Sequence, residues 1–223
     1  MSLPSPNFGE RRGGARASLI VLHYTGMESC AAARDRLCDP VAEVSAHWLI
    51  SEAGAVEALV DEEMRAWHAG AGAWAGLTDI NSHSIGIELA NRGDHPFPEP
   101  QMRALEELLR QIMARWDIPP HRVIGHSDMA PDRKSDPGRR FDWRRLARQG
   151  LAIWPVLSPT PVGVSDFCAL ARQAGYGDYS DELILRALRL RFRPWAEGPL
   201  TTEDLQILAA LATIAVDAPQ GTA

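Results

Sequence analysis

The chain has 223 residues, of which 45% are hydrophobic and 23% are charged; these values indicate a globular protein of one large domain, or of a medium domain and a small one. Its formal net charge of −6 argues against nucleic acid as the main partner, because phosphate binding requires clustered lysine and arginine residues. Three cysteines without a C-x-x-C pair argue against a disulfide framework or a thiolate zinc site, and no stretch reaches the roughly 18 apolar residues of a membrane span.

The N-terminal part of the chain predicts a strand followed by a helix. Residues 1–18 have no long apolar core before a cleavage site, so no signal peptide is predicted and the chain as written is expected in the cytoplasm. A chain from which an export signal had been trimmed would instead belong in the periplasm or cell envelope. The apolar run 17–26 contains His23 near its polar end and predicts a buried strand. Residues 29–39 begin with a capping serine and are rich in alanine, which predicts a helix.

The middle of the chain alternates between strand and helix patterns. Residues 44–51 and 55–61 flank a Glu-Ala-Gly turn and predict a hairpin. Residues 84–91 alternate as a strand does, whereas residues 99–118 have apolar side chains at helical spacing until two prolines end the helix. The short strand 122–126 follows and ends in a histidine. This alternation indicates an α/β domain in which helices cover a sheet.

The last third of the chain predicts a linker and a group of helices. Residues 154–164 are rich in proline, which is typical of a linker. Helical patterns then occupy three ranges, 165–175, 180–192 and 201–215. The predicted division is a first domain at 1–155, a proline-rich linker at 156–164 and a small three-helix domain at 165–217.

Two histidines, His23 and His126, each follow an apolar strand directly. Functional groups of layered α/β domains are displayed at strand ends, so both histidines are candidates for a functional site. Two imidazoles and one carboxylate form a zinc site with three protein ligands and a position open for water, which is the pattern of catalytic zinc. The alternative is an acid–base pair of histidines without metal. Three candidate carboxylates follow His126 within ten residues: Asp128, Asp132 and Asp136.

Two more charged residues are candidates for catalysis. Glu88 stands between Ile87 and Leu89, where a buried carboxylate is unfavourable unless it has a task or a partner. We expect Glu88 to act as a base; the alternative is a solvent-facing glutamate on an edge strand. Lys134, two residues before Asp136, is a candidate cation for a developing oxyanion, against the alternative of a solvated loop lysine. No G-x-S-x-G motif is present, so a serine nucleophile is not predicted.

The order of five segments resembles the zinc-dependent N-acetylmuramoyl-L-alanine amidase family, the type-2 amidases related to peptidoglycan recognition proteins. These segments are IVLHYTG, SAHWLISEAG, AWHAG, NSHSIGIELAN and VIGHSDMAPDRKSDPGRRFDW, and the resemblance covers about residues 4–155. It implies a mixed β-sheet flanked by helices, with one zinc ion per chain at an end of the sheet. It also implies hydrolysis of the amide bond between N-acetylmuramic acid, or its anhydro form, and L-alanine of the peptidoglycan stem peptide.

The resemblance also implies roles for individual residues. His23 and His126 match the histidine ligands, and Asp136 matches the third ligand, a choice that the residue pattern alone leaves open. Glu88 matches the catalytic acidic residue, and Lys134 matches the lysine that stabilises the oxyanion. The expected partners are peptidoglycan or soluble muropeptides, and the sequence indicates neither which of the two is preferred nor an oligomeric state. The residues expected to bind substrate in the groove are Tyr24, Trp67, His68 and Asn81.

The C-terminal helices resemble the three-helix peptidoglycan-binding module that follows some bacterial amidases. LRLRFRP and EGPLTTEDLQIL match its second and third helices, but its usual Phe-Gln pair is absent, with Arg189 and Leu190 in that region. The helices are therefore expected either to bind glycan or only to support the first domain. The alternative function for the whole chain is a non-catalytic peptidoglycan or muropeptide sensor, which would lack a metal ligand or Glu88.

Overall fold

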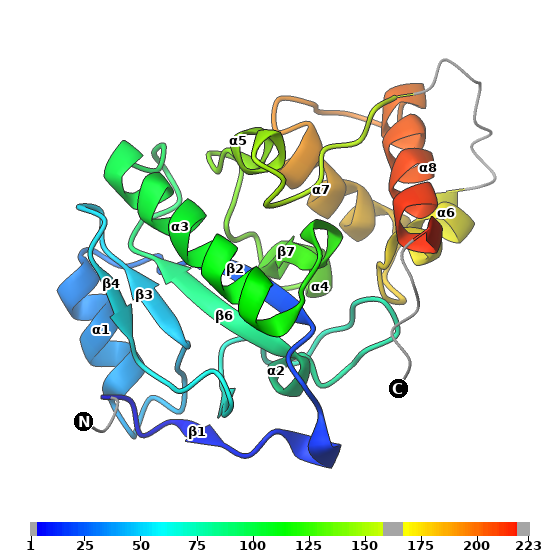
Figure 1. Cartoon of the computed structure of the whole chain (residues 1–223). Helices are drawn as coiled ribbons and strands as arrows, with labels where there is room; N and C mark the ends of the chain where they lie inside the picture. Colours follow the sequence, from blue (N-terminus) through cyan, green and yellow to red (C-terminus); the bar gives the residue numbers. More distant parts are fainter. Residues whose placement is uncertain (1–3, 158–166, 218–223) are drawn as a thin grey trace.

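A five-stranded mixed sheet forms the centre of the protein (Figure 1). The computed structural model describes residues 4–157 and 167–217. The strand order is β4-β3-β6-β2-β7, in which β4 is antiparallel to β3 and the other neighbours are parallel. The strands are β2 (Leu19–Tyr24), β3 (Trp48–Ile50), β4 (Val56–Ala58), β6 (Ser84–Leu89) and β7 (Val123–Gly125). A separate antiparallel pair joins β1 (Phe8–Gly9) to β5 (Arg65–Ala66).

The central strands β2 and β6 are almost continuously apolar because helices cover both of their faces. Their parallel register pairs His23 with Glu88, and β7 pairs Gly125 with Leu22. Because His126 directly follows Gly125, the register brings His23, Glu88 and His126 to the same edge of the sheet. Both histidines therefore lie at strand ends, where functional groups of layered α/β domains are displayed.

Helix α3 (Glu99–Trp116) covers one face of the sheet (Figure 1). Its apolar stripe includes Leu105, Leu109 and Ile112, which are fully buried against β2 and β6 side chains. Helix α1 (Cys30–Cys38) follows β2 and begins where the Ser29 side chain accepts a hydrogen bond from the Ala32 amide. The remaining helices of this part are α2 (Ile80–His83), α4 (His126–Met129) and α5 (Trp143–Arg148). The mixed sheet flanked by helices confirms the predicted fold.

The opposite face of the sheet packs against the C-terminal helices, α6 (Phe167–Ala174), α7 (Asp181–Phe192) and α8 (Thr202–Asp217). Leu19, Val21 and Ile124 of the sheet share one buried cluster with Leu188 of α7 and Leu208 of α8. The helical patterns of the sequence therefore correspond to helices. Most of the predicted linker falls at residues 158–166, outside the described residues, and the division into domains stays a prediction. Over the ranges that the structure describes, no helix combines the length and apolar composition needed to cross a membrane.

Candidate metal centre

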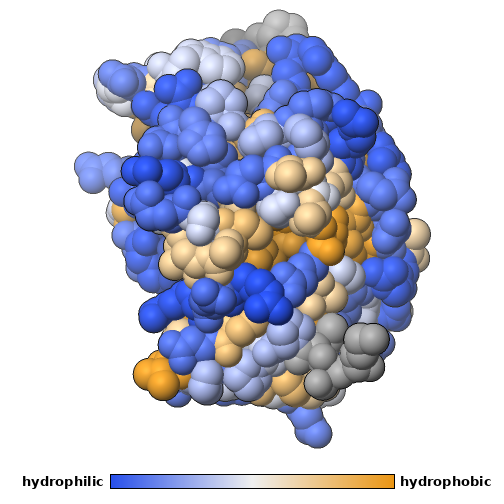
Figure 2. Space-filling view, turned by 90° about the vertical axis from the view of Figure 1, so that its left-hand side faces the viewer, coloured by the Kyte–Doolittle hydropathy of each residue, from blue (hydrophilic) through white to orange (hydrophobic). Residues whose placement is uncertain are grey.

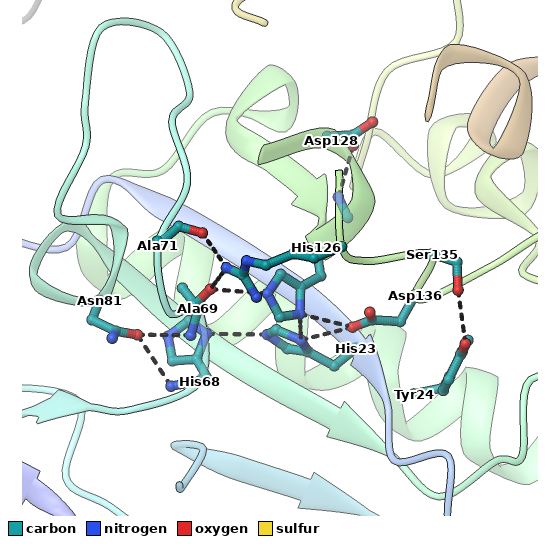
Figure 3. Close-up of polar contacts among 12 residues, drawn as sticks. His23, Tyr24, His68, Ala69, Ala71, Asn81, His126, Asp128, Ser135 and Asp136 are labelled. Carbon is teal, nitrogen blue, oxygen red and sulfur yellow. Dashed lines mark hydrogen bonds and ion pairs between the residues drawn. The ribbon is translucent and has the colours of Figure 1, made fainter. Parts of the chain in front are cut away.

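Three buried side chains converge at the ends of β2 and β7 (Figure 3). His23 is at the end of β2, His126 opens α4, and Asp136 is in the loop that follows. The Nδ1 atoms of the two histidines lie 2.9 Å apart, and Oδ2 of Asp136 lies 2.9 Å from Nδ1 of His23 and 3.0 Å from Nδ1 of His126. The structure therefore brings together the three residues that the resemblance assigned to metal binding.

The tautomer of His126 is set by its second ring nitrogen. Nε2 of His126 lies 3.0 Å from the backbone carbonyl oxygen of Ala69. A carbonyl oxygen can only accept a hydrogen bond, so Nε2 carries the hydrogen and donates it. In the neutral imidazole, Nδ1 of His126 is therefore unprotonated and presents its lone pair to the other two side chains.

A chain of three hydrogen bonds sets the tautomer of His23 in the same way. The Ser84 hydroxyl donates to the carbonyl of Ile80 at 2.6 Å, so its oxygen accepts from Nε2 of His68 at 3.2 Å. Nδ1 of His68 is then unprotonated and accepts from Nε2 of His23 at 3.0 Å. The remaining nitrogen of His23, Nδ1, is bare. The His68 ring lies directly over Gly86, where an added Cβ would come within 2.4 Å of it.

Both imidazoles are thus arranged as acceptors beside a carboxylate. Burial, together with the neighbouring His126, lowers the pKa of His23 to about 4, so His23 is neutral near pH 7. The lone pairs of the two Nδ1 atoms and the carboxylate oxygen, 2.9–3.0 Å apart, converge on a common point that a cation could occupy. This donor set of two imidazole nitrogens and one carboxylate oxygen fits zinc.

Glu88 points into the same site from the central strand β6, so the alternative of an edge-strand glutamate is wrong. Its side chain is half-buried, and Oε2 has no hydrogen-bond partner among the described residues. Burial and, to a smaller extent, the negative charge of Asp136 raise the pKa of Glu88 to about 8, against the opposing charge of Lys134. A carboxyl group with a pKa near neutrality can both accept and release a proton at physiological pH.

The convergent side chains line a cavity of about 370 Å³. Tyr24, Trp67 and His68 are among its lining residues, as are Glu88 and Lys134. The lining also includes residues of α1 and the segments beside it: Met27, Ala33, Arg36, Leu37 and Val44. Figure 2 views the molecule from the side on which α1 lies and shows a band of apolar surface bordered by hydrophilic residues. The site therefore offers a ligand both apolar contact and charged groups.

The four residues expected to bind substrate occupy different places. The Tyr24 hydroxyl is at the cavity, 3.0 Å from Oγ of Ser135, and Trp67 is on its wall. His68 is buried behind His23. Asn81 is buried further back, where its Oδ1 accepts hydrogen bonds from the backbone amides of His68 and Ala69 (Figure 3). Asn81 therefore holds the loop that carries His68.

Sequence reasoning did not single out Ser84, although it orients His68. A signal for it exists in the period of the strand, because Ser84, Gly86 and Glu88 occupy one face of β6. A glycine inside an apolar strand marks a close approach by another group, which here is the His68 ring. That signal points to the neighbourhood of Ser84 but does not identify the approaching group.

Known proteins resemble both the sequence and the structure. A family model described as N-acetylmuramoyl-L-alanine amidase matches residues 13–139. The N-acetylmuramoyl-L-alanine amidase AmiD of Escherichia coli is 34% identical over 230 residues, which covers 87% of this chain and 81% of that protein. The 1,6-anhydro-N-acetylmuramyl-L-alanine amidase AmpD of Haemophilus influenzae is 34% identical over 161 residues, covering 64% of this chain and 88% of that protein. A solved complex of the Escherichia coli AmiD with anhydro-N-acetylmuramic acid-L-Ala-D-gamma-Glu-L-Lys has a TM-score of 0.81 at 32% identity, covering 93% of this chain and 98% of that one.

Proposed function

The chain belongs to the N-acetylmuramoyl-L-alanine amidase family, and we propose that it uses one zinc ion to hydrolyse the amide between N-acetylmuramic acid, or its anhydro form, and L-alanine of the stem peptide. His23, His126 and Asp136 would hold the ion. The observation that carries this proposal is the convergence of two imidazole nitrogens and a carboxylate oxygen in a geometry that could hold a metal ion. Bound zinc supplies a Lewis acid and makes water a stronger nucleophile at neutral pH.

The chain's own residues account for the proton transfers and the charge of the reaction. Glu88 lies beside the metal ligands with its pKa raised to about 8, so it is suited to take a proton from the attacking water. The same carboxyl group then delivers the proton to the amine nitrogen of L-alanine as the carbon–nitrogen bond breaks. Lys134 lines the cavity next to Asp136 and stabilises the negative oxygen that forms when water adds to the carbonyl.

The partner is a peptidoglycan fragment, as it is in the AmiD complex. A direct test compares purified sacculi with soluble anhydro-muropeptides, each incubated with the zinc-loaded protein and with a chelated sample. We expect free stem peptide in the zinc-loaded samples only. Faster release from soluble substrate fits a cytoplasmic enzyme, and faster release from sacculi fits a cell-envelope enzyme. Binding of either substrate without any release would instead indicate a non-catalytic sensor.

Replacing Lys134 with methionine is expected to lower kcat by about 10²–10³-fold, which is typical of the loss of one oxyanion-stabilising donor. The zinc content of the variant should equal that of the unchanged protein, because Lys134 is not among the converging ligands. Steady-state hydrolysis of an anhydro-muropeptide, with metal analysis of the same sample, measures both quantities. Lys134→Arg keeps the charge and should retain more activity. A Lys134→Met enzyme with unchanged kcat would show that this lysine is only a solvated loop residue.

Replacing His68 with leucine is expected to weaken zinc binding by about 10- to 100-fold, as is typical when the hydrogen-bond partner of a metal-binding histidine is lost. Leucine cannot accept the hydrogen bond from Nε2 of His23, so the ring loses the contact that leaves its Nδ1 bare. Competition with a coloured chelator measures the affinity without turnover. His68→Gln, whose amide oxygen can accept that bond, is the matched control. If folded His68→Leu binds zinc as tightly as the unchanged protein, His68 does not orient His23 for zinc binding.

A further inference from the structure

A buried ion pair connects the C-terminal helices to the segment that carries His126. Nη1 of Arg191 in α7 lies 2.7 Å from Oδ2 of Asp128, and the two side chains are only 3% and 1% exposed. Nη2 of Arg191 also donates to the backbone carbonyl of Val123 at 2.9 Å. The guanidinium group lies 4.2 Å from the ring centroid of Trp143. One side chain from α7 therefore binds both the beginning of β7 and the short helix α4.

Asp128 transmits this contact to the backbone beside the metal ligand. Its Oδ2 accepts a hydrogen bond from the Gly125 amide at 2.8 Å as well as the one from Arg191. Figure 3 shows the Asp128 side chain directed away from the point where His23, His126 and Asp136 meet. Asp128 therefore fixes the turn from β7 into α4, and His126 is the first residue after that turn.

Other residues of the C-terminal part contact the same segment. The Tyr176 hydroxyl donates to Oδ1 of Asp128 at 3.4 Å, and the Tyr179 hydroxyl donates to the carbonyl of Met129 at 3.0 Å. The Arg186 guanidinium of α7 donates to the carbonyl of Pro131. With the shared apolar cluster beneath them, these contacts follow the chain from β7 into the loop toward Asp136. The C-terminal part therefore packs against, and hydrogen-bonds to, the segment between the ligands His126 and Asp136.

We propose that Arg191 is a positioning residue for the metal centre, and that the C-terminal helices hold His126 in place through the Arg191–Asp128 pair. The physical reason is that a buried carboxylate that loses its paired cation is strongly destabilised, so the Asp128 side chain would move out of its present position. That movement would release the Gly125 amide and with it the backbone that aims the His126 ring. This inference rests on the proposed function only in taking the three converging residues as metal ligands.

The chain offers a closely matched control on the same helix. Arg189 and Asp204 also form a buried pair, with Nη2 of Arg189 lying 2.7 Å from Oδ2 of Asp204, but this pair joins α7 to α8 within the C-terminal part. Arg191→Met and Arg189→Met therefore each break one buried Arg–Asp pair of α7, and Asp204 retains a second ion pair with Arg193. Only the first of the two variants removes a contact to α4.

The first readout is zinc affinity, measured by competition with a coloured chelator in the full chain at a temperature where each variant is folded. We expect the dissociation constant of Arg191→Met to rise by about 10- to 100-fold, and that of Arg189→Met to change by less than about 2-fold. Arg191→Lys keeps the charge but has no second nitrogen to donate to the Val123 carbonyl. Its dissociation constant for zinc should lie between those of the unchanged protein and of Arg191→Met. Equal affinities in Arg191→Met and Arg189→Met would overturn the proposal.

The second readout is amide hydrogen exchange of the metal-free protein, which does not depend on the proposed function. Exchange over residues 123–130 should speed up by at least about 10-fold in Arg191→Met and Asp128→Asn, and remain unchanged in Arg189→Met. Failure of every variant and of the unchanged chain to bind zinc would refute the metal site while exchange still decides the positioning role. If Arg191→Met does not fold, the same measurements on Arg191→Lys and Asp128→Asn test whether the Arg191–Asp128 pair positions His126. Unchanged protection of residues 123–130 in these variants would contradict the proposal.

Discussion

Glu88→Gln is expected to lower the rate of amide hydrolysis by about 10²–10⁴-fold, the range typical of a lost general acid–base group. Glutamine has nearly the shape of glutamate and can be accommodated next to Asp136, but it cannot accept a proton from water. Zinc content should be retained, because Glu88 is not one of the converging ligands. Hydrolysis of an anhydro-muropeptide, followed by chromatography of the released peptide, measures the effect. Substantial turnover by Glu88→Gln would mean that another group carries the proton.

The same substitution is expected to stabilise the metal-free protein at pH 8. The pKa of Glu88 is raised from 4.5 to about 8 by folding, mainly through burial, so the folded state favours the protonated carboxyl. A raised carboxyl pKa means that stability is lost as the pH rises from the unfolded value toward the folded one. Glu88→Gln removes this loss. The gain in unfolding free energy of Glu88→Gln over the unchanged protein should therefore be larger at pH 8 than at pH 4, by on the order of 4 kcal/mol.

Denaturant unfolding at the two pH values measures this gain. Glu107→Gln, on the exposed face of α3, is the control and should change neither activity nor the pH dependence of stability. A stability difference between Glu88→Gln and the unchanged protein that is the same at pH 4 and pH 8 would show that Glu88 titrates as an ordinary exposed carboxylate. The expected combination, a less active and more stable protein, is typical of a residue kept for catalysis.

Asp136→Ala is expected to abolish both zinc binding and hydrolysis. Alanine removes one of three converging ligand atoms and leaves the two imidazoles without the charge that completes the site. In the unchanged protein, zinc at 100 times its dissociation constant should add about 2.7 kcal/mol to the unfolding free energy, since zinc binds the folded state. Asp136→Ala should show no such gain.

Unfolding curves with and without added zinc, together with the rate of stem-peptide release, test this prediction. Asp132→Ala is the matched control, because Asp132 belongs to the same loop but is exposed to solvent. It should retain the zinc-dependent stabilisation and the activity. An Asp136→Ala protein that is still stabilised by one equivalent of zinc would exclude Asp136 as a ligand.

The placement of His23 and His126 at strand ends could be predicted because each directly follows an apolar strand pattern in the sequence. The choice of Asp136 over Asp128 needed more than residue spacing, since all three loop aspartates follow His126 closely. In the structure the difference is physical: Asp128 is turned inward by Arg191, a residue 63 positions away in the chain, and its carboxylate is occupied by the Gly125 amide. No local sequence pattern around Asp128 predicts that its partner is Arg191.

The hydrogen bonds that orient the site were also beyond prediction. Whether His68 faces a substrate or another histidine depends on the approach of its loop to Gly86, which only the folded chain defines. The C-terminal helices are a similar case, because an apolar stripe predicts that a helix is packed but not what it packs against. In this protein part of that surface is the sheet itself, through Leu19, Val21 and Ile124.

Hydrolysis in water labelled with ¹⁸O tests the central claim most directly, because the label reports which bond is broken. The zinc-loaded protein would be incubated with anhydro-N-acetylmuramic acid-L-Ala-D-gamma-Glu-L-Lys, and the masses of both products would be measured by mass spectrometry. We expect one ¹⁸O atom in the lactyl carboxyl group of the anhydro-sugar and none in the released peptide, whose L-alanine gains a free amine. Label in a carboxyl group of the peptide, or intact substrate in the presence of bound zinc, would contradict the assignment of this chain as an amidase of the muramyl–L-alanine bond.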